Sequence, residues 1–233
     1  MKKDFHIFGL CFLYTSIIAV TFQHLVLPAL SSGIDAGSGL IRGGDWVGFH
    51  GVAVDLSQAI LENGWPEWQL RPSGWSPAGV AAGFYALTGI SHPSIMIPLN
   101  AALFSLAAVF VHRTLRIISP QFAIYGLIPF FVFPSALEIY GQIHKDVWVV
   151  AGFSVAGFLV AQCVYGEIVR FNEIMLNLIL AVVAASLVWV GKPYVATLMI
   201  PGVVLTLGYC LLARRAQGWP VLAGGRAVLV LLL

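Results

Sequence analysis

The chain has 233 residues, of which 59% are hydrophobic and only 9% are charged, and its formal net charge is +2. Because such long apolar runs cannot stay exposed to water, this composition excludes an ordinary soluble domain and indicates a polytopic membrane protein. The sequence also lacks a phosphate-binding glycine loop and a basic nucleic-acid patch, so no nucleic-acid partner is expected.

Several apolar segments are long enough to cross a bilayer, since about 20 residues span a core of about 30 Å as a helix. The first follows Met-Lys-Lys-Asp and has no small-residue cleavage site, so an uncleaved signal anchor is predicted. Residues 227–233 have the composition of a further span's first turns, which suggests the N-terminal part of a longer chain. The predicted fold is all-α, a transmembrane bundle of about six to seven spans in a single domain over 1–233, with spans near 7–30, 94–112, 121–137, 147–165, 174–190 and 194–212.

Residues 76–91 decide the predicted topology, because counting them as a span would move every later loop to the other side. If they do not cross, eight Lys or Arg residues face the cytoplasm and four face outward, and the numbers reverse if they do. The positive-inside rule favours the first arrangement. We therefore expect 76–91 to be a re-entrant or interfacial helix, the N-terminus to be cytoplasmic, and 31–93 to form an extracytoplasmic loop.

The first loop contains an apolar stripe at helical spacing, which predicts a surface helix over 46–63 with its apolar side on the membrane: Phe49, Val52, Ala53, Leu56 and Ile60. Asn63-Gly64 is predicted to end this helix. Asp45 precedes it, where its carboxylate is either an N-cap worth about 1 kcal/mol or a functional group held at the membrane surface. These two interpretations are compatible.

Polar residues also gather before the span at 147–165. Lys145 and Asp146 either mark the end of a span or work in a site, and His144 is either an exposed turn residue or a general acid. Lys192 either extends to the interface or belongs to the same site. Asp55 lies on the wet face of the surface helix, from which it could also contact an acceptor.

The order of several short motifs resembles a known family. These are "GGD" with Phe49 four residues on, then "GVAVDLSQAILENG", "AGFYALTGISHPSI" and "LNAALFSLAAVFVHRTLR". Together they resemble the N-terminal half of the GT-C superfamily, multispanning glycosyltransferases that use polyprenyl-phosphate sugars. This group includes the dolichyl-phosphate-mannose protein mannosyltransferase-like and the aminoarabinose-transferase-like enzymes. The resemblance implies a multi-pass cell membrane protein, with the bacterial inner membrane expected, and an extracytoplasmic active site.

The resemblance also implies roles for particular residues. Asp45 matches the family's catalytic carboxylate by its place after the glycines, and Asp146 matches a second acidic position in a pattern with Pro134, Tyr140 and Lys145. Lys192 matches a basic residue at the outer end of the fifth span. His50 departs from the family, whose members commonly carry an aromatic residue such as tyrosine there.

The chemistry of glycosyl transfer agrees with these roles, because it needs a carboxylate to deprotonate the acceptor and cations to hold the leaving phosphate. Asp45 suits the first role, and Lys145, Lys192 and Arg71 suit the second. Asp146 is expected to orient Lys145, to contact the acceptor, or to help Asp45 bind an optional divalent cation; no metal site is assigned. The expected partners are a polyprenyl-phosphate hexose or pentose donor, a lipid, glycan or protein acceptor, and membrane lipid, with substrate contacts assigned to His50, Asp55, Arg71, His144, Lys145 and Lys192.

Three other functions stay open at this point. An outer-leaflet glycan polymerase or ligase would use a similar donor but would carry arginine-rich motifs in a large later loop. A non-catalytic membrane partner would not need Asp45, Asp146 and Lys192 to converge in space. A transporter usually carries ionisable groups in mid-span or broken helices in matched halves, and neither feature is found here.

Overall fold

The computed structural model describes residues 2–29, 33–133, 140–165, 171–199 and 201–202. Within these ranges the chain is helical and contains no strand, only an isolated bridge between Asp35 and Ile41, so the all-α prediction is confirmed. The chain divides into two compact units, residues 1–106 with 129–147, and residues 107–128 with 148–233. The expected single domain over 1–233 stays a prediction.

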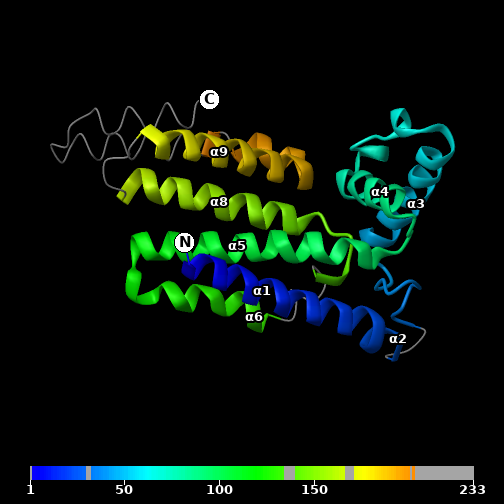
Figure 1. The fold of residues 1–233 in the computed structure, drawn as a ribbon, viewed down its shortest axis with the longest axis horizontal. Helices are drawn as coiled ribbons and strands as arrows, with labels where there is room; N and C mark the ends of the chain where they lie inside the picture. Colours follow the sequence, from blue (N-terminus) through cyan, green and yellow to red (C-terminus); the bar gives the residue numbers. More distant parts are fainter. Residues whose placement is uncertain (1, 30–32, 134–139, 166–170, 200, 203–233) are drawn as a thin grey trace. The chain divides into compact units, whose positions relative to one another are not determined.

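The helices follow one another along the chain as Figure 1 shows. Those that belong wholly or in part to the first unit are α1 (Lys2–Thr21), the π-helical turn η1 (Phe22–Val26), α2 (Leu27–Ala29), α3 (Asp45–Asn63), η2 (Trp65–Glu67), η3 (Pro72–Gly74), α4 (Ser76–Thr88), η4 (Pro93–Met96), α5 (Ile97–Ile118), α6 (Ile128–Val132) and α8 (Asp146–Tyr165). The second unit contains the later part of α5, η5 (Pro120–Leu127), most of α8, and α9 (Phe171–Gly191).

Three of the described helical segments are long and apolar enough to cross a membrane: Lys2–Ala29, Pro93–Ile118 and Asp146–Tyr165. Two further apolar helices, Pro120–Val132 and Met175–Gly191, are shorter. The described residues therefore support an all-α chain with three candidate spans, not the six to seven that were expected. The expected spans at 121–137 and 194–212 extend beyond the described residues.

The two helices predicted in the first loop are confirmed as α3 and α4. Gly64 ends α3 with a φ of +95° and donates its N–H to the Ile60 carbonyl at 2.8 Å, as the Asn-Gly pair predicted. Gly89 ends α4 in the left-handed conformation, donating in the same way to the Tyr85 carbonyl. Both ends use glycine because side chains rarely adopt positive φ.

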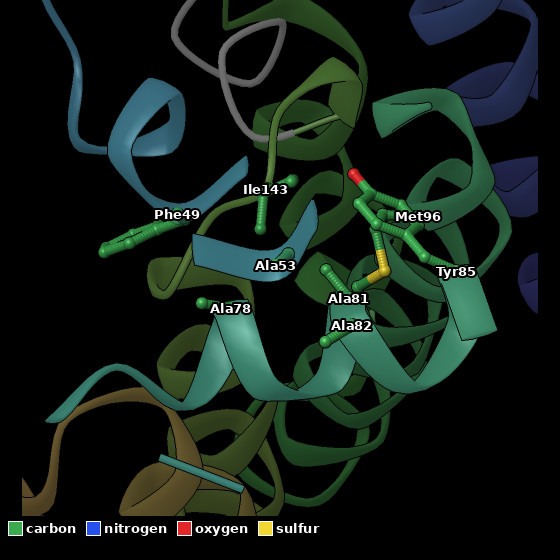
Figure 2. Close-up of a cluster of buried hydrophobic side chains, with 8 residues drawn as sticks. All are labelled: Phe49, Ala53, Ala78, Ala81, Ala82, Tyr85, Met96 and Ile143. Carbon is green, nitrogen blue, oxygen red and sulfur yellow. The ribbon is translucent and has the colours of Figure 1, made fainter. Parts of the chain in front are cut away.

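The apolar stripe of α3 packs against α4, and the predicted position of α3 on the membrane surface stays a prediction. In Figure 2 the small side chains of α4 lie below Ala53 of α3, so the two helices approach closely. Met96 and Ile143 complete this cluster, whose buried members are Phe49, Ala53, Ala78, Ala81, Ala82, Tyr85, Met96 and Ile143. Because Ile143 comes from the segment before α8, the cluster joins that segment to the α3–α4 pair.

The second unit is held by apolar packing between helices. A Cβ atom on Gly152 of α8 would lie 2.5 Å from Cγ2 of Val188 and 2.8 Å from the carbonyl oxygen of Ala184, both on α9. This glycine therefore permits the close approach of α8 and α9. Arg113 of α5 lies over the ring of Phe158 on α8, 5.9 Å from its centroid.

Candidate functional site

Asp45 and Lys145, 100 residues apart in the sequence, form an ion pair in the first unit. Nζ of Lys145 donates to Oδ2 of Asp45 at 2.6 Å, and the two side chains are 35% and 65% exposed, respectively. The same ammonium group lies 5.6 Å from the centroid of the Phe49 ring. The segment before α8 thus meets the start of α3 through Lys145. The pair is open enough to be reached by a substrate.

Two glycines place the Asp45 carboxylate. Gly43 has a φ of +91°, and Gly44 occupies the N-cap position of α3 in an extended conformation. A Cβ atom on Gly44 would overlap the Trp46 ring, only 2.1 Å from its nearest atom. Asp45 is the first residue of the helix, not its cap, so the N-cap interpretation is wrong; its negative charge still interacts favourably with the positive end of the helix dipole.

A buried glutamine fixes the segment that carries Lys145. The side chain of Gln142 is fully buried, accepts a hydrogen bond from the Ile41 N–H at 3.1 Å, and donates to the Gly39 carbonyl at 3.3 Å. Its backbone carbonyl accepts a hydrogen bond from Nδ2 of Asn100 on α5 at 2.7 Å. Gln142 therefore joins the chain before α8 to the chain before α3, since buried polar groups are stable only when they are hydrogen-bonded.

A second glutamine fixes the preceding residue from the other side. Nε2 of Gln23, in the π-helical turn, donates to the Gly141 carbonyl at 3.0 Å. Gly39, with a φ of +73°, lies so close to Gln23 that a Cβ atom would be 2.2 Å from its Cγ atom. This close approach explains why residue 39 must be glycine.

His144 and Asp146 interact with each other. Nδ1 of His144 accepts a hydrogen bond from the backbone N–H of Asp146 at 3.0 Å, and it lies 3.7 Å from Oδ2 of the same residue. The His144 ring packs against Trp46 at 5.6 Å and is 15% exposed, so it is not the exposed turn residue of one interpretation. His144 and Asp146 thus flank Lys145, and the His144 ring joins this segment to Trp46 in the first turn of α3.

His50 lies about one and a half turns beyond Asp45 on α3 and contacts α4. Its Nδ1 atom lies 3.0 Å from the hydroxyl oxygen of Tyr85. Burial lowers the pKa of His50, and the nearby His92 lowers it further. Burial also raises the pKa of Tyr85, so its hydroxyl stays protonated and can donate to the neutral imidazole. This hydrogen bond connects α3 to α4.

The other predicted substrate contacts are more dispersed. Asp55 is exposed, and ten residues of helix place it about 15 Å along α3 from Asp45, so it does not join the Asp45–Lys145 pair. Arg71 is half-buried directly before η3. Lys192 belongs to the second unit, where its N–H donates to the Val188 carbonyl at the end of α9, so its role stays a prediction. Pro134, part of the predicted pattern, lies outside the described residues.

Among the described residues, no group of three or more His, Cys, Asp or Glu side chains is placed to hold a metal ion. Asp45 contacts Lys145, and Asp146 lies beside His144. These observations give the optional divalent cation no ligand set in the described part of the chain.

Sequence reasoning assigned no role to Gln23, Gln142 or the stacked rings of His24 and His92, whose centroids lie 5.5 Å apart. A polar amide in a largely apolar chain was the available signal for the two glutamines, but the same residue type is common on exposed turns. No family model matches this chain, and neither a curated protein nor a solved structure matches it.

Proposed function

We propose that this protein is a membrane glycosyltransferase that transfers a hexose or pentose from a polyprenyl-phosphate donor to an acceptor on the extracytoplasmic side. The observation that carries the proposal is the contact of Asp45 with Lys145 at 2.6 Å in an exposed position. A carboxylate and an ammonium group are the two kinds of group that the reaction needs, one for the acceptor proton and one for the leaving phosphate.

The proposed reaction is a single displacement. The acceptor hydroxyl oxygen forms a bond to the anomeric carbon, and the bond from that carbon to the phosphate oxygen breaks. The electron pair of that bond leaves with polyprenyl phosphate, and the hydroxyl proton passes to Asp45. Lys145 stabilises the negative charge that develops on the phosphate, as a compact cation does for phosphate in other sites.

The ion pair gives this mechanism an order of events. Without donor, the ammonium group of Lys145 is paired with the carboxylate of Asp45. A bound donor phosphate competes for the ammonium group of Lys145. Its arrival draws Lys145 away and leaves Asp45 available to accept the acceptor's proton. Donor binding would thus precede deprotonation.

The same contact supports the proposed topology. Asp45 and Lys145 must lie on one side of the membrane, so the chain between them crosses an even number of times. Candidate span Pro93–Ile118 is one crossing, and we propose a second crossing that begins in the shorter apolar helix Pro120–Val132. This count leaves α4 as a helix that does not cross. We accordingly propose six to seven spans, a cytoplasmic N-terminus and an extracytoplasmic site.

Further contacts to the substrates are proposed for residues around the pair. Asp146, at the start of α8, would contact the acceptor or keep Lys145 oriented, and His144 would assist beside it. His50, Arg71 and Lys192 are proposed to contact the donor or the acceptor, which is a lipid, a glycan or a protein.

The test is a sugar-transfer assay in membranes with radiolabelled polyprenyl-phosphate sugars, comparing wild type, Asp45→Asn and Glu62→Gln at matched expression. Glu62 is an exposed acid at the other end of α3, so Glu62→Gln is a matched control that should transfer like wild type. Removal of the base should lower transfer by about 10²-fold or more. Equal transfer by Asp45→Asn and wild type would show that Asp45 is not the base.

The donor that labels the product identifies the sugar in the same assay. Absence of transfer by wild type with every donor tested would favour the other functions, namely an outer-leaflet glycan polymerase or ligase, a non-catalytic membrane partner, or a transporter.

A further inference from the structure

The residues next to Asp45 and Lys145 are joined by a chain of other contacts, while the two charged groups stay exposed. Gln142 accepts a hydrogen bond from the N–H of Ile41, and the Ile41 carbonyl accepts one from Nε1 of Trp46. The Trp46 ring packs against His144, two residues after Gln142. This chain of contacts flanks the ion pair, because Trp46 follows Asp45 directly and His144 precedes Lys145 directly.

Gln142 is the one member of this chain of contacts whose side chain uses both a donor and an acceptor. Its Oε1 atom binds the Ile41 N–H and its Nε2 atom binds the Gly39 carbonyl, while the side chain is 0% exposed. Lys145 follows Gln142 by three residues, so their Cα atoms are at most about 11 Å apart. The position of Gln142 against Gly39 and Ile41 therefore limits where the Lys145 backbone can be.

An exposed ion pair cannot supply this precision, because such pairs contribute little and their long side chains move freely. Asp45 is 65% exposed, so water and salt compete with Lys145 for its carboxylate. A buried, two-point amide contact is directional and excludes water. A buried amide can therefore limit the positions of the two backbone segments that carry the charged groups.

We propose that Gln142 is a positioning residue that holds Lys145 opposite Asp45. Its effect on catalysis rests on the proposed function, whereas its effect on the geometry does not. Replacing Gln142 by methionine, of similar length but without the amide, leaves the Ile41 N–H and the Gly39 carbonyl without their present partner. The segment before α8 then shifts, and Lys145 moves relative to Asp45.

The geometric test uses cross-linking in native membranes of the full chain with Cys11, Cys163 and Cys210 replaced by alanine. Asp45→Cys and Lys145→Cys are introduced together and treated with a short bifunctional thiol reagent. This pair of substitutions removes the ion pair, so any proximity that persists comes from the surrounding contacts. We expect a high cross-link yield that falls several-fold when Gln142→Met is added. An unchanged yield would overturn the proposal.

Two controls separate positioning from general misfolding. Gln162→Met makes the same chemical change on α8, where Oε1 of Gln162 has no hydrogen-bond partner, and it should leave the yield unchanged. The pair Gly48→Cys and Trp75→Cys reports the α3–α4 contact, since a Cβ atom on Gly48 lies 3.9 Å from the Trp75 ring, and its yield should survive Gln142→Met.

If Gln142→Met also abolishes the Gly48–Trp75 cross-link, Gln142→Glu decides the question. A buried carboxyl group has a raised pKa, so at about pH 5 it is protonated and can both donate and accept, whereas at about pH 8 a larger fraction is ionised and cannot donate. The Asp45–Lys145 cross-link of this variant, divided by the yield of the chain with Gln142 at the same pH, should recover at the lower pH, since this ratio removes the slower reaction of thiols in acid. A ratio that does not depend on pH would overturn the proposal.

The kinetic test uses Gln142→Met in the otherwise unchanged chain. A displaced cation should lower kcat by about 10²-fold with a much smaller change in KM, and Gln142→Glu should restore turnover at the lower pH. Cross-linking that depends on Gln142 in a chain that transfers no sugar would leave the positioning role intact and defeat the proposed function. Sugar transfer that depends on Asp45 but not on Gln142 would support the proposed function and defeat the positioning role of Gln142.

Discussion

The segments around Asp45 and Lys145 and the contact of α8 with α9 are held together by different kinds of interaction. The first depends on buried amides, with Gln23 and Gln142 hydrogen-bonded to backbone groups of Gly141, Gly39 and Ile41. The second depends on a small residue, Gly152, that lets two apolar helices approach closely. The first region is therefore held by directional hydrogen bonds, and the α8–α9 contact by close packing of apolar side chains.

This difference matters for function. Hydrogen bonds are sensitive to angle and distance, so they can fix charged groups within a narrow range. Apolar packing specifies volume, and hydrophobic groups of similar size can replace one another with little loss. The region with the candidate site therefore needs particular residues, whereas the α8–α9 contact needs only the right volumes. The following predictions test that comparison in order of decreasing effect.

The largest effect is expected from Gly39→Val. The substitution forces a β-branched residue to a φ of +73° and places Cβ 2.2 Å from Gln23, so the strain and the overlap add. We expect a loss of about 3 kcal/mol or more in stability, measured as a fall in the thermal midpoint in detergent. Gly37→Val is the matched control, because Gly37 has a φ of +95° but open space around it, and it should lose only the strain energy. Equal losses would show that the contact with Gln23 does not matter.

A smaller loss is expected from Gly152→Val between α8 and α9. The added side chain meets Val188 and the Ala184 carbonyl, and overpacking of this kind costs about 1–3 kcal/mol because apolar helices can shift apart. Gly157→Val, on the same helix with no atom within 4 Å, should change stability little. Sugar transfer by Gly152→Val should fall less than transfer by Gly39→Val. The opposite order would contradict the comparison.

The smallest effect is expected from pH. Burial lowers the pKa values of His50 and His92, and His92 is also affected by His24, whose ring it stacks on. The folded chain binds protons at these two histidines less tightly than the unfolded chain does. Their contribution to the free energy of unfolding is therefore fully present above about pH 6.5 and is lost as the pH falls below that value. The thermal midpoint of the first unit should therefore decrease toward about pH 5.

His92→Gln should flatten that dependence, because it removes the central histidine of the three. His6→Gln, at an exposed position near the start of α1, is the control and should leave the slope unchanged. An identical slope in wild type and His92→Gln would show that this group of histidines does not control the acid response.

The sequence predicted the local elements of the first loop well. The apolar stripe at helical spacing and Gly64 predict α3 to within a residue at each end, because helical periodicity and positive φ are properties of short stretches of chain. It did not predict that the stripe on α3 would face α4, since an apolar face packs equally well on lipid or on another helix. Three candidate spans lie among the described helices, and the larger number that the sequence predicts stays a prediction, because several of the expected spans extend beyond the described residues.

The sequence by itself determined that this protein is helical, apolar enough for a membrane, and equipped with acidic and basic groups near the ends of its apolar segments. Only the tertiary structure decided that Lys145 pairs with Asp45 and that Gln142 is buried between Gly39 and Ile41. The physical reason is the distance along the sequence over which each kind of interaction acts. Periodicity and capping act over a few residues, whereas the Asp45–Lys145 contact joins groups 100 residues apart and depends on how α3, α5 and the segment before α8 pack together.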